Sequence, residues 1–225
     1  MRRYAIIVGG GSGSRMGGGI PKQFRSICGR PMIWWAMKAF YDENPATEII
    51  LVLPENFISL WNDFFTSLPE QDRIIHRVTA GGATRTESVK NGLKLVKDKD
   101  ATVAVHDGAR PMLKKDLICR GWSAVEETGA AIPIVELVDS LREINEKDSI
   151  AVDRSKFRAV QTPQVFLATI LKNAYEGNPG IFTDDAAAVE SSGIKITLYD
   201  GDPDNLKVTT PKDMVIAEML LREHA

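Results

Sequence analysis

The sequence has few of the residues from which disulfide scaffolds and zinc sites are built. Its 225 residues include two cysteines and three histidines, and Cys28 and Cys119 stand far apart and outside any Cys-x-x-Cys pair. Disulfide frameworks and structural zinc sites need more of these residues at closer spacing. We therefore expect neither, and we expect a protein that works in a reducing cytoplasm.

Long hydrophobic runs are also missing. The apolar run that begins at Tyr4 ends after five residues at Val8, and no stretch approaches the length of a membrane span. Charge of one sign is not in excess either, because 28 Lys and Arg are balanced by 30 Asp and Glu. The sequence therefore predicts neither a membrane nor a nucleic acid as a partner.

What is present is the composition of a soluble globular protein, with 44% hydrophobic and 26% charged residues. Segments with strand and helix patterns alternate along the chain without an internal repeat. This predicts one α/β domain over residues 1–225, with a Rossmann-like, mostly parallel twisted sheet flanked by helices. The expected strands are 4–8, 48–53, 74–78, 101–105, 130–138 and 194–199, and the expected helices are 31–41, 54–68, 89–96, 113–128 and 211–221.

Residues 139–165 interrupt this alternation. Two short alternating pieces, Leu141–Ile144 and Phe157–Val160, and the turn-like segment Asn145–Ser149 predict a hairpin without a partner helix. An excursion of this kind from a parallel α/β core often packs on another subunit. We therefore expect 139–165 to form a protruding β-arm.

A glycine-rich loop follows the first expected strand. Seven of the eleven residues from Gly9 to Gly19 are glycine, and Arg15 and Lys22 add two positive charges to the same stretch. Glycines leave backbone N–H groups open to an anion, because they permit close approach and positive φ angles. The loop is therefore equipped to hold a polyphosphate. A flexible linker is the alternative, although linkers seldom follow a first strand directly.

The spacing excludes two common phosphate-binding motifs. A Walker A loop requires Gly-Lys-Ser/Thr, but Lys22 stands between Pro21 and Gln23. A dinucleotide fingerprint requires a third glycine where this chain has Ser14 or Met16.

Three further segments carry candidate site residues. The segment His106–Pro111 (HDGARP), which contains Asp107, directly follows the expected strand 101–105. Ligands of open α/β sheets bind at the carboxyl ends of such strands. The Asp107 carboxylate suits Mg²⁺, directly or through water, although an Asp–Arg surface pair is an alternative. We expect His106 to be structural. Residues 79–88 (TAGGATRTES) form either a second nucleotide-contacting loop or a plain capped turn. Lys207 is either a candidate site residue or an ordinary surface lysine.

The motifs taken in order resemble those of a known family. GSGSRMG followed by Pro21-Lys22-Gln23, then HDGARP, then KVTTP around Lys207 resemble the sugar-phosphate nucleotidyltransferases, and most closely the 2-C-methyl-D-erythritol 4-phosphate cytidylyltransferases. The resemblance covers essentially the whole chain. It implies a Mg²⁺-dependent (or other divalent-cation-dependent) reaction of CTP with a small sugar-alcohol phosphate in non-mevalonate isoprenoid biosynthesis. It also implies a homodimer held by the β-arm, which lends residues to the neighbouring site.

The resemblance assigns roles to individual residues. It implies catalytic roles for Arg15 and Lys22, nucleotide contacts for Gly9, Gly10, Gly11, Gly13, Ser14, Gly82, Ser88, Asp107, Arg110 and Lys207, and substrate contacts for Ser140, Arg154, Thr162 and Thr183. From the residues alone, Arg154 is equally a solvated surface charge, and 182–186 (FTDDA) is equally a helix N-terminus. The chain departs from the family pattern at Gly9, usually alanine, at Ala83, often acidic, and at Ser140, often threonine.

Three alternative functions stay open on the sequence. A ribitol 5-phosphate cytidylyltransferase shares the first loop and the overall plan. An NAD-dependent oxidoreductase shares the fold class but requires a glycine register that is missing here. A CTP-binding regulator without turnover is the third.

Overall fold

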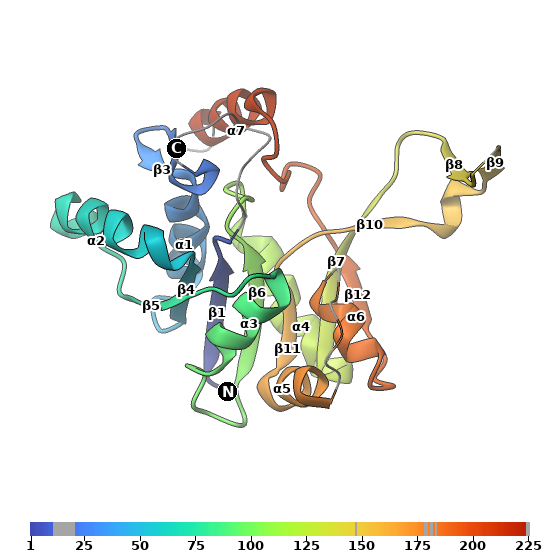
Figure 1. The fold of residues 1–225 in the computed structure, drawn as a ribbon, viewed down its shortest axis with the longest axis horizontal. Helices are drawn as coiled ribbons and strands as arrows, with labels where there is room; N and C mark the ends of the chain where they lie inside the picture. Colours follow the sequence, from blue (N-terminus) through green and yellow to red (C-terminus); the bar gives the residue numbers. More distant parts are fainter. Residues whose placement is uncertain (11–20, 147, 178–179, 181, 183, 224–225) are drawn as a thin grey trace.

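The computed structural model describes residues 1–10, 21–146, 148–177, 180, 182 and 184–223. Figure 1 shows a central sheet with helices on both sides and a hairpin that extends away from the body. Five of the predicted site residues, Gly11, Gly13, Ser14, Arg15 and Thr183, lie outside the described residues.

The central sheet has the strand order β10-β7-β11-β6-β1-β4-β5, and β12 pairs with β7 as well. β1 is parallel to β4 and to β6, β4 is parallel to β5, and β12 is parallel to β7, whereas β10 and β11 run antiparallel to their neighbours. The mostly parallel sheet predicted from the sequence is confirmed. The strands are β1 (Arg3–Val8), β4 (Glu48–Leu53), β5 (His76–Ala80), β6 (Thr102–Asp107), β7 (Ala130–Glu136), β10 (Arg158–Val160), β11 (Gln164–Leu167) and β12 (Thr197–Asp200).

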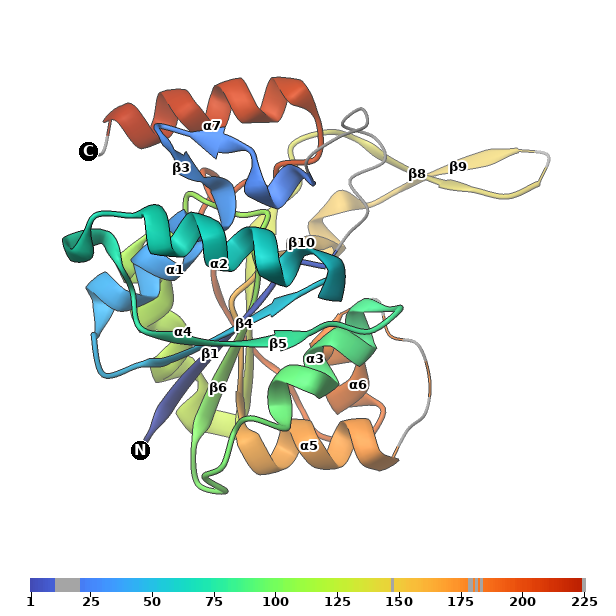
Figure 2. The same cartoon turned by 60° about the vertical axis from the view of Figure 1, so that its left-hand side comes forward.

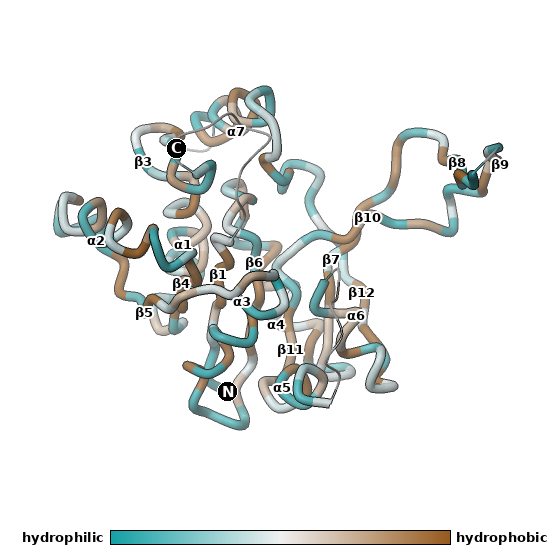
Figure 3. The backbone as a smooth tube through the Cα atoms, viewed as in Figure 1, coloured by the Kyte–Doolittle hydropathy of each residue, from teal (hydrophilic) through white to brown (hydrophobic). Residues whose placement is uncertain are grey.

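Side chains of β1 alternate between two hydrophobic layers. Tyr4, Ile6 and Val8 pack in one layer, and Ala5 and Ile7 pack in the other. Because helices cover both faces, the strand reads as an unbroken apolar run rather than an alternating one. Figure 3 shows this hydrophobic interior along the central strands.

The helices divide between the two layers. α3 (Arg85–Leu93), α5 (Ala168–Gly177) and α6 (Asp185–Glu190) cover the face of Ile6, whereas α1 (Met32–Glu43), α2 (Ile58–Ser67) and α4 (Lys115–Thr128) cover the face of Ile7. Figure 2 shows α3, α5 and α6 grouped on one side. Trp34 on α1 is 4% exposed and packs in the same layer as Ile7.

A smaller third cluster lies beyond the carboxyl ends of the strands. α7 (Pro211–Glu223) packs there on a two-stranded sheet formed by β2 (Ser26–Ile27) and β3 (Arg30–Pro31). Ile27, Val208 and Ala217 are buried in this cluster. Thr210 caps α7 by accepting a hydrogen bond from the Asp213 N–H at 3.3 Å, as its position before Pro211 predicts. In α6 the N-cap is Asp184, whose side chain accepts from the Ala187 N–H at 2.9 Å.

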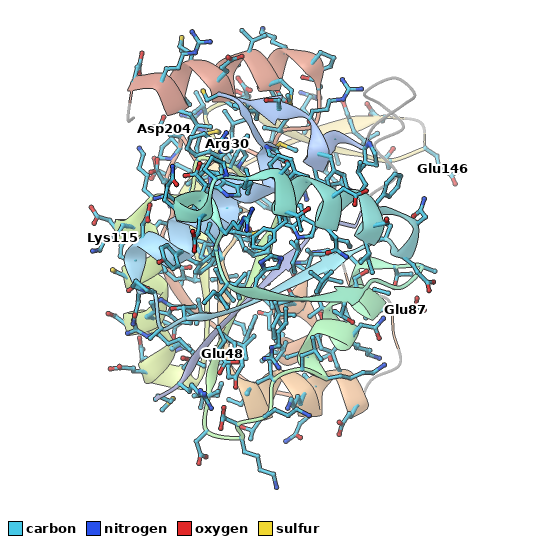
Figure 4. All side chains as sticks on the ribbon, turned by 90° about the vertical axis from the view of Figure 1, so that its left-hand side faces the viewer. Arg30, Glu48, Glu87, Lys115, Glu146 and Asp204 are labelled. Carbon is cyan, nitrogen blue, oxygen red and sulfur yellow. The ribbon has the colours of Figure 1, made fainter. Side chains whose placement is uncertain are left out.

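The projecting hairpin is shorter than the predicted arm. β8 (Leu141–Ile144) and β9 (Ser149–Val152) pair only with each other among the described strands, as Figures 1 and 2 show. β10 and β11, which begin at Arg158 and Gln164, belong to the central sheet instead. For β11 the reason is burial, since Val165 and Phe166 fill opposite hydrophobic layers. Glu146, labelled in Figure 4, lies at the far end of the hairpin.

Candidate active site

The carboxyl ends of four parallel strands bring the candidate loops together. Each loop stays hydrogen-bonded to the neighbouring strand as it leaves the sheet, with the N–H of Gly9 on Val52 O at 2.8 Å, that of Gly81 on Leu53 O at 2.7 Å, and that of Gly108 on Val8 O at 3.0 Å. A side chain at Gly9 would meet the tips of Ile33 and Leu53, each at 2.7 Å. The packing here thus accounts for a glycine at this position.

Two cavities lie side by side at this edge. The first, about 210 Å³, is lined by Val8, Gly9, Gly10, Lys22, Gln23, Arg85, Asp107, Ala109 and Lys207. The second, about 220 Å³, is lined by Arg85, Asp107, Arg110, Val160, Gln161, Thr162, Gln164, Asp184 and Lys207. Arg85, Asp107 and Lys207 border both cavities, so they stand at the junction of the two, which we call together the cleft.

Asp107 is held between two cations at this junction. Its Oδ1 accepts from Arg85 Nε at 3.3 Å, and its Oδ2 accepts from Lys207 Nζ at 2.7 Å. Burial alone would raise the pKa of this carboxyl, but the charges of Arg85 and Lys207 outweigh burial and hold the pKa well below its usual range. Asp107 is therefore an anion at any physiological pH.

Lys22 reaches the first cavity from the short helical turn Lys22–Phe24. Its Nζ donates to the carbonyl oxygen of Val208 at 2.9 Å, which places the ammonium next to the Lys207 loop. The adjacent Gln23 is buried and donates to the carbonyl oxygen of Gly9 at 2.6 Å. The structure thus joins the Pro-Lys-Gln motif to the end of β1 and to the Lys207 segment, as a shared site requires.

His106 and Thr162 support the backbone at Asp107. His106 Nε2 contacts the carbonyl oxygen of Arg110 at 3.1 Å, and its Nδ1 contacts Thr162 Oγ1 at 3.0 Å. Because a carbonyl only accepts, Nε2 carries the proton and Nδ1 accepts from the Thr162 hydroxyl. That hydroxyl oxygen in turn accepts the Asp107 N–H at 3.1 Å. Burial lowers the pKa of His106 to about 4, so the ring is neutral and structural, as expected.

Arg110 lies at the floor of the second cavity. Its Nη1 donates to the carbonyl oxygen of Asn205 at 2.6 Å, and within the described chain its buried Nε has no hydrogen-bond acceptor. Burial lowers the pKa of Arg110, opposed by the charge of Asp107. A buried donor without a partner is costly unless a ligand or water completes it, so Arg110 suits an anionic ligand in this cavity.

The second glycine loop is shaped by Ser88. The Ser88 hydroxyl accepts the Gly82 N–H at 3.1 Å and donates to the carbonyl oxygen of Thr84 at 2.9 Å. Gly82 and Ser88 are not among the described residues that line the two cavities. In this structure the Ser88 side chain therefore builds the turn, and a direct nucleotide contact by either residue stays a prediction.

Ser140 and Arg154 belong to the hairpin region. Arg154 is exposed and donates to the carbonyl oxygen of Val138. Of the four predicted substrate contacts, only Thr162 is a described lining residue of the cleft; Ser140 and Arg154 are exposed, and neither borders it in the described chain.

Arg85 is the main site residue that the sequence reasoning missed. It borders both cavities and joins Asp107 to Asp185 through its Nε and Nη2 atoms, at 3.3 and 2.7 Å. Its sequence position held a signal. An arginine that directly follows a Thr84 N-cap opposes the helix dipole, so it requires carboxylate partners.

Comparison with known proteins identifies the family of this chain. The family described as IspD, 2-C-methyl-D-erythritol 4-phosphate cytidylyltransferase, matches residues 4–223. Proteins of that description from Phocaeicola vulgatus and Azobacteroides pseudotrichonymphae are 41% and 45% identical to this chain, covering 98% of it and 100% and 99% of their own lengths. A crystal structure from Thermus thermophilus with the same description superposes with a TM-score of 0.78 at 30% identity, covering 99% of this chain and 100% of the other.

Proposed function

Because the chain belongs to the 2-C-methyl-D-erythritol 4-phosphate cytidylyltransferase family, we infer that it is a nucleotidyltransferase that joins CTP to 2-C-methyl-D-erythritol 4-phosphate in isoprenoid biosynthesis. The observation that carries this proposal is the cation-flanked Asp107 at the junction of two cavities, with Lys22 beside it. We further propose that residues 1–225 form one such domain. Family membership does not favour the ribitol phosphate, oxidoreductase or regulator alternatives.

The reaction exchanges one phosphoanhydride bond for another. An oxygen of the methylerythritol phosphate attacks the α-phosphorus of CTP, a P–O bond forms there, and the bond from the α-phosphorus to the bridging oxygen of the β-phosphate breaks. Pyrophosphate leaves with that electron pair. The attacking phosphate is already ionised at neutral pH, so no covalent enzyme intermediate and little acid–base work are required. The difficulty is the approach of one polyanion to another, and catalysis consists of positioning and charge neutralisation.

The two cavities suit the two substrates. The first carries Gly10, near the start of the glycine-rich stretch, and Lys22, at its end, which suits the triphosphate of CTP. The second carries Thr162, which the resemblance assigns to the sugar-alcohol phosphate, together with Arg110, which the resemblance assigns to the nucleotide. The α-phosphorus would then lie at their junction, where Lys207 can neutralise the developing charge. Arg15, which the resemblance makes catalytic, keeps that role as a proposal.

The donor set suits a divalent cation that arrives with the nucleotide. Among the described residues, no group of three or more His, Cys, Asp or Glu side chains could hold a metal unaided. Mg²⁺ usually binds one or two carboxylates together with substrate phosphates, and Asp107 at the cleft junction matches that pattern. We propose that Asp107 holds Mg²⁺, directly or through water. When bound, the ion would neutralise phosphate charge and orient the triphosphate.

We also propose a homodimer built on the hairpin. Val138, Ile144, Ile150 and Phe157 expose 83%, 74%, 59% and 45% of their surface. Apolar side chains gathered on one projecting segment are typical of a protein interface. Such a dimer would allow Ser140 and Arg154 to serve a neighbouring cleft. Analytical ultracentrifugation of the wild type and of an Ile144→Asp, Ile150→Asp variant tests this, and a wild-type monomer would contradict it.

A cytoplasmic location, suggested by the low cysteine content, belongs to the same proposal. Within the described residues, no helix is both long and apolar enough to cross a bilayer.

Pyrophosphate release with two acceptor substrates tests the function. CTP and Mg²⁺ are supplied with methylerythritol 4-phosphate in one reaction and ribitol 5-phosphate in another. We expect release in the first alone. Release in the second alone would keep the mechanism and overturn the substrate, and CTP binding without release in either would indicate a regulator.

A further inference from the structure

Arg85 connects the cleft to the interior of the protein. Its Nε donates to Asp107 Oδ1 at 3.3 Å, and its Nη2 donates to Asp185 Oδ2 at 2.7 Å. A guanidinium is planar and rigid, so a partner that fixes one N–H group also fixes the direction of the other. The position of Asp185 therefore determines where Arg85 meets Asp107.

Asp185 is itself held firmly. It is completely buried, with 0% of its surface exposed, in the first turn of α6. Its Oδ1 accepts from the Tyr175 hydroxyl at 2.5 Å, and its backbone N–H donates to Gln164 Oε1 at 3.1 Å. Burial, followed by the charge of Asp185, raises the pKa of Tyr175 well above its usual range, so the phenol remains a neutral donor. Both carboxylate oxygens of Asp185 are thereby committed to fixed partners.

Lys207, the other cation on Asp107, is held differently. It reaches Asp107 Oδ2 at 2.7 Å from the loop before α7, and its side chain is 45% exposed. A long lysine side chain with that exposure can change partner at little cost. Asp107 thus has one cation anchored in the interior and one that reaches in from a solvent-facing loop.

We propose that Tyr175, Asp185 and Arg85 form a positioning relay that fixes Asp107 in the cleft, while Lys207 exchanges between Asp107 and the anionic substrate. Arg85 keeps Asp107 in place after Lys207 has moved to a phosphate. The relay rests on the proposed function for its role in the reaction, but its geometry belongs to the protein without substrate.

The same molecule provides a matched control. Tyr4 donates to Asp98 Oδ2 at 2.5 Å, and Arg2 donates to the same oxygen at 3.2 Å. This second Tyr–Asp–Arg triad includes Tyr4 of β1, and its arginine also meets Glu48 Oε1 at 2.9 Å. It has the chemistry of the relay without a connection to the cleft.

Steady-state kinetics of paired variants tests the role in the reaction. Asp185→Asn is expected to lower kcat about tenfold to hundredfold, the usual effect of losing a partner behind a ligand. Tyr175→Phe, which removes one hydroxyl and keeps the ring, is expected to lower kcat about threefold or more. In each variant the KM for methylerythritol 4-phosphate should change by a smaller factor than kcat does. Tyr4→Phe and Asp98→Asn should retain wild-type kcat, and equal losses in both pairs would overturn the relay.

A double-mutant cycle separates positioning from general damage. If Arg85 acts through Asp185, the variant Arg85→Lys, Asp185→Asn should be no slower than the slower single variant. Additive losses would show that the two residues act independently and would overturn the relay.

A readout without turnover separates this proposal from the proposed function. In ¹⁵N-arginine NMR, the Arg85 Nε–H should exchange slowly with solvent in the wild type and in Tyr4→Phe, and faster in Tyr175→Phe and Asp185→Asn. Unchanged exchange in Tyr175→Phe would overturn the relay even if Asp185→Asn fails to fold. Absence of pyrophosphate release by the wild type would overturn the function and leave this geometric test decisive for the relay.

Discussion

The relay Tyr175–Asp185–Arg85 and the triad Tyr4–Asp98–Arg2 contain the same residue types, and both have a phenol 2.5 Å from a carboxylate oxygen. Their surroundings differ. The Asp185 side chain is 0% exposed and that of Asp98 is 39% exposed. The relay leads to Asp107 in the cleft, whereas the other triad leads to Glu48 at a solvent-facing edge. Local chemistry is therefore a poor guide to importance, and burial together with the next partner decides what such a cluster does.

The largest expected contrast is between substitutions in the cleft and substitutions in the Tyr4–Asp98–Arg2 triad, and it concerns the rate of turnover. We expect Lys22→Ala to slow turnover about a hundredfold to a thousandfold, because removing one charge-assisted contact in a transition state costs about 2.7–4 kcal/mol. Arg15→Ala should behave in the same way. Arg2→Ala, in that triad, should retain the wild-type rate. Initial rates of pyrophosphate release, with folding checked by circular dichroism, measure this, and a fully active Lys22→Ala would refute the assigned role.

The next contrast is in stability. Asp185→Asn leaves Arg85 without its buried counter-ion, and breaking a buried ion pair from one side costs about 3–5 kcal/mol. Urea unfolding should show a clear fall in the free energy of unfolding for this variant. Asp98→Asn should lose much less, because the Asp98 side chain is 39% exposed and its ion pair with Arg2 lies at the surface. Equal losses for the two variants would mean that burial does not distinguish the clusters.

The free energy of unfolding should also depend on pH, because His106 is buried next to Asp107 in the cleft. The pKa of His106 falls from an ordinary value near 6.5 to about 4 in the folded state, so the unfolded chain binds more protons between these values. Stability should therefore be complete above pH 6.5 and decline as pH falls toward 4, by about 3 kcal/mol in total. Asp107, with a depressed pKa, contributes stability above about 3.8 that is lost only at lower pH.

The measurement is thermal unfolding from pH 7 to pH 4.5, with His106→Asn as the variant. The variant should show a shallower decline than the wild type over this interval. Parallel curves would show that His106 does not cause the decline.

The smallest expected effect concerns the two phenols. Tyr4→Phe and Tyr175→Phe each remove one hydrogen bond to a carboxylate, and Tyr175→Phe should be the less stable of the two because it leaves Oδ1 of the buried Asp185 without a donor. Burial raises the pKa of Tyr4 to about 12, so neither phenol ionises at neutral pH. Differential scanning calorimetry with kinetics should then separate stability from rate, because only Tyr175→Phe should alter kcat.

The sequence predicted the sheet and much of the cleft for physical reasons that can be named. Continuous apolar runs such as Glu48–Leu53 indicate strands covered on both faces, and strand ends locate Asp107. It could not assign Arg85 to the cleft, because its place after the Thr84 N-cap indicates that it needs carboxylate partners but not which carboxylates they are. Nor could it place Gln164–Leu167 in the sheet, since only tertiary packing distinguishes a buried antiparallel strand from the end of an arm.

One contact has a consequence for how the protein is made. Lys22 Nζ binds the carbonyl oxygen of Val208, and the Val208 N–H binds the carbonyl oxygen of Ala109 at 2.8 Å. During synthesis β1, β4, β5 and β6 emerge early and can pair while the Lys207–Val208 segment is still to be added. A nascent chain can therefore build its sheet with the cleft still lacking Lys207. The cleft therefore becomes complete only after the Lys207–Val208 segment has joined the earlier strands.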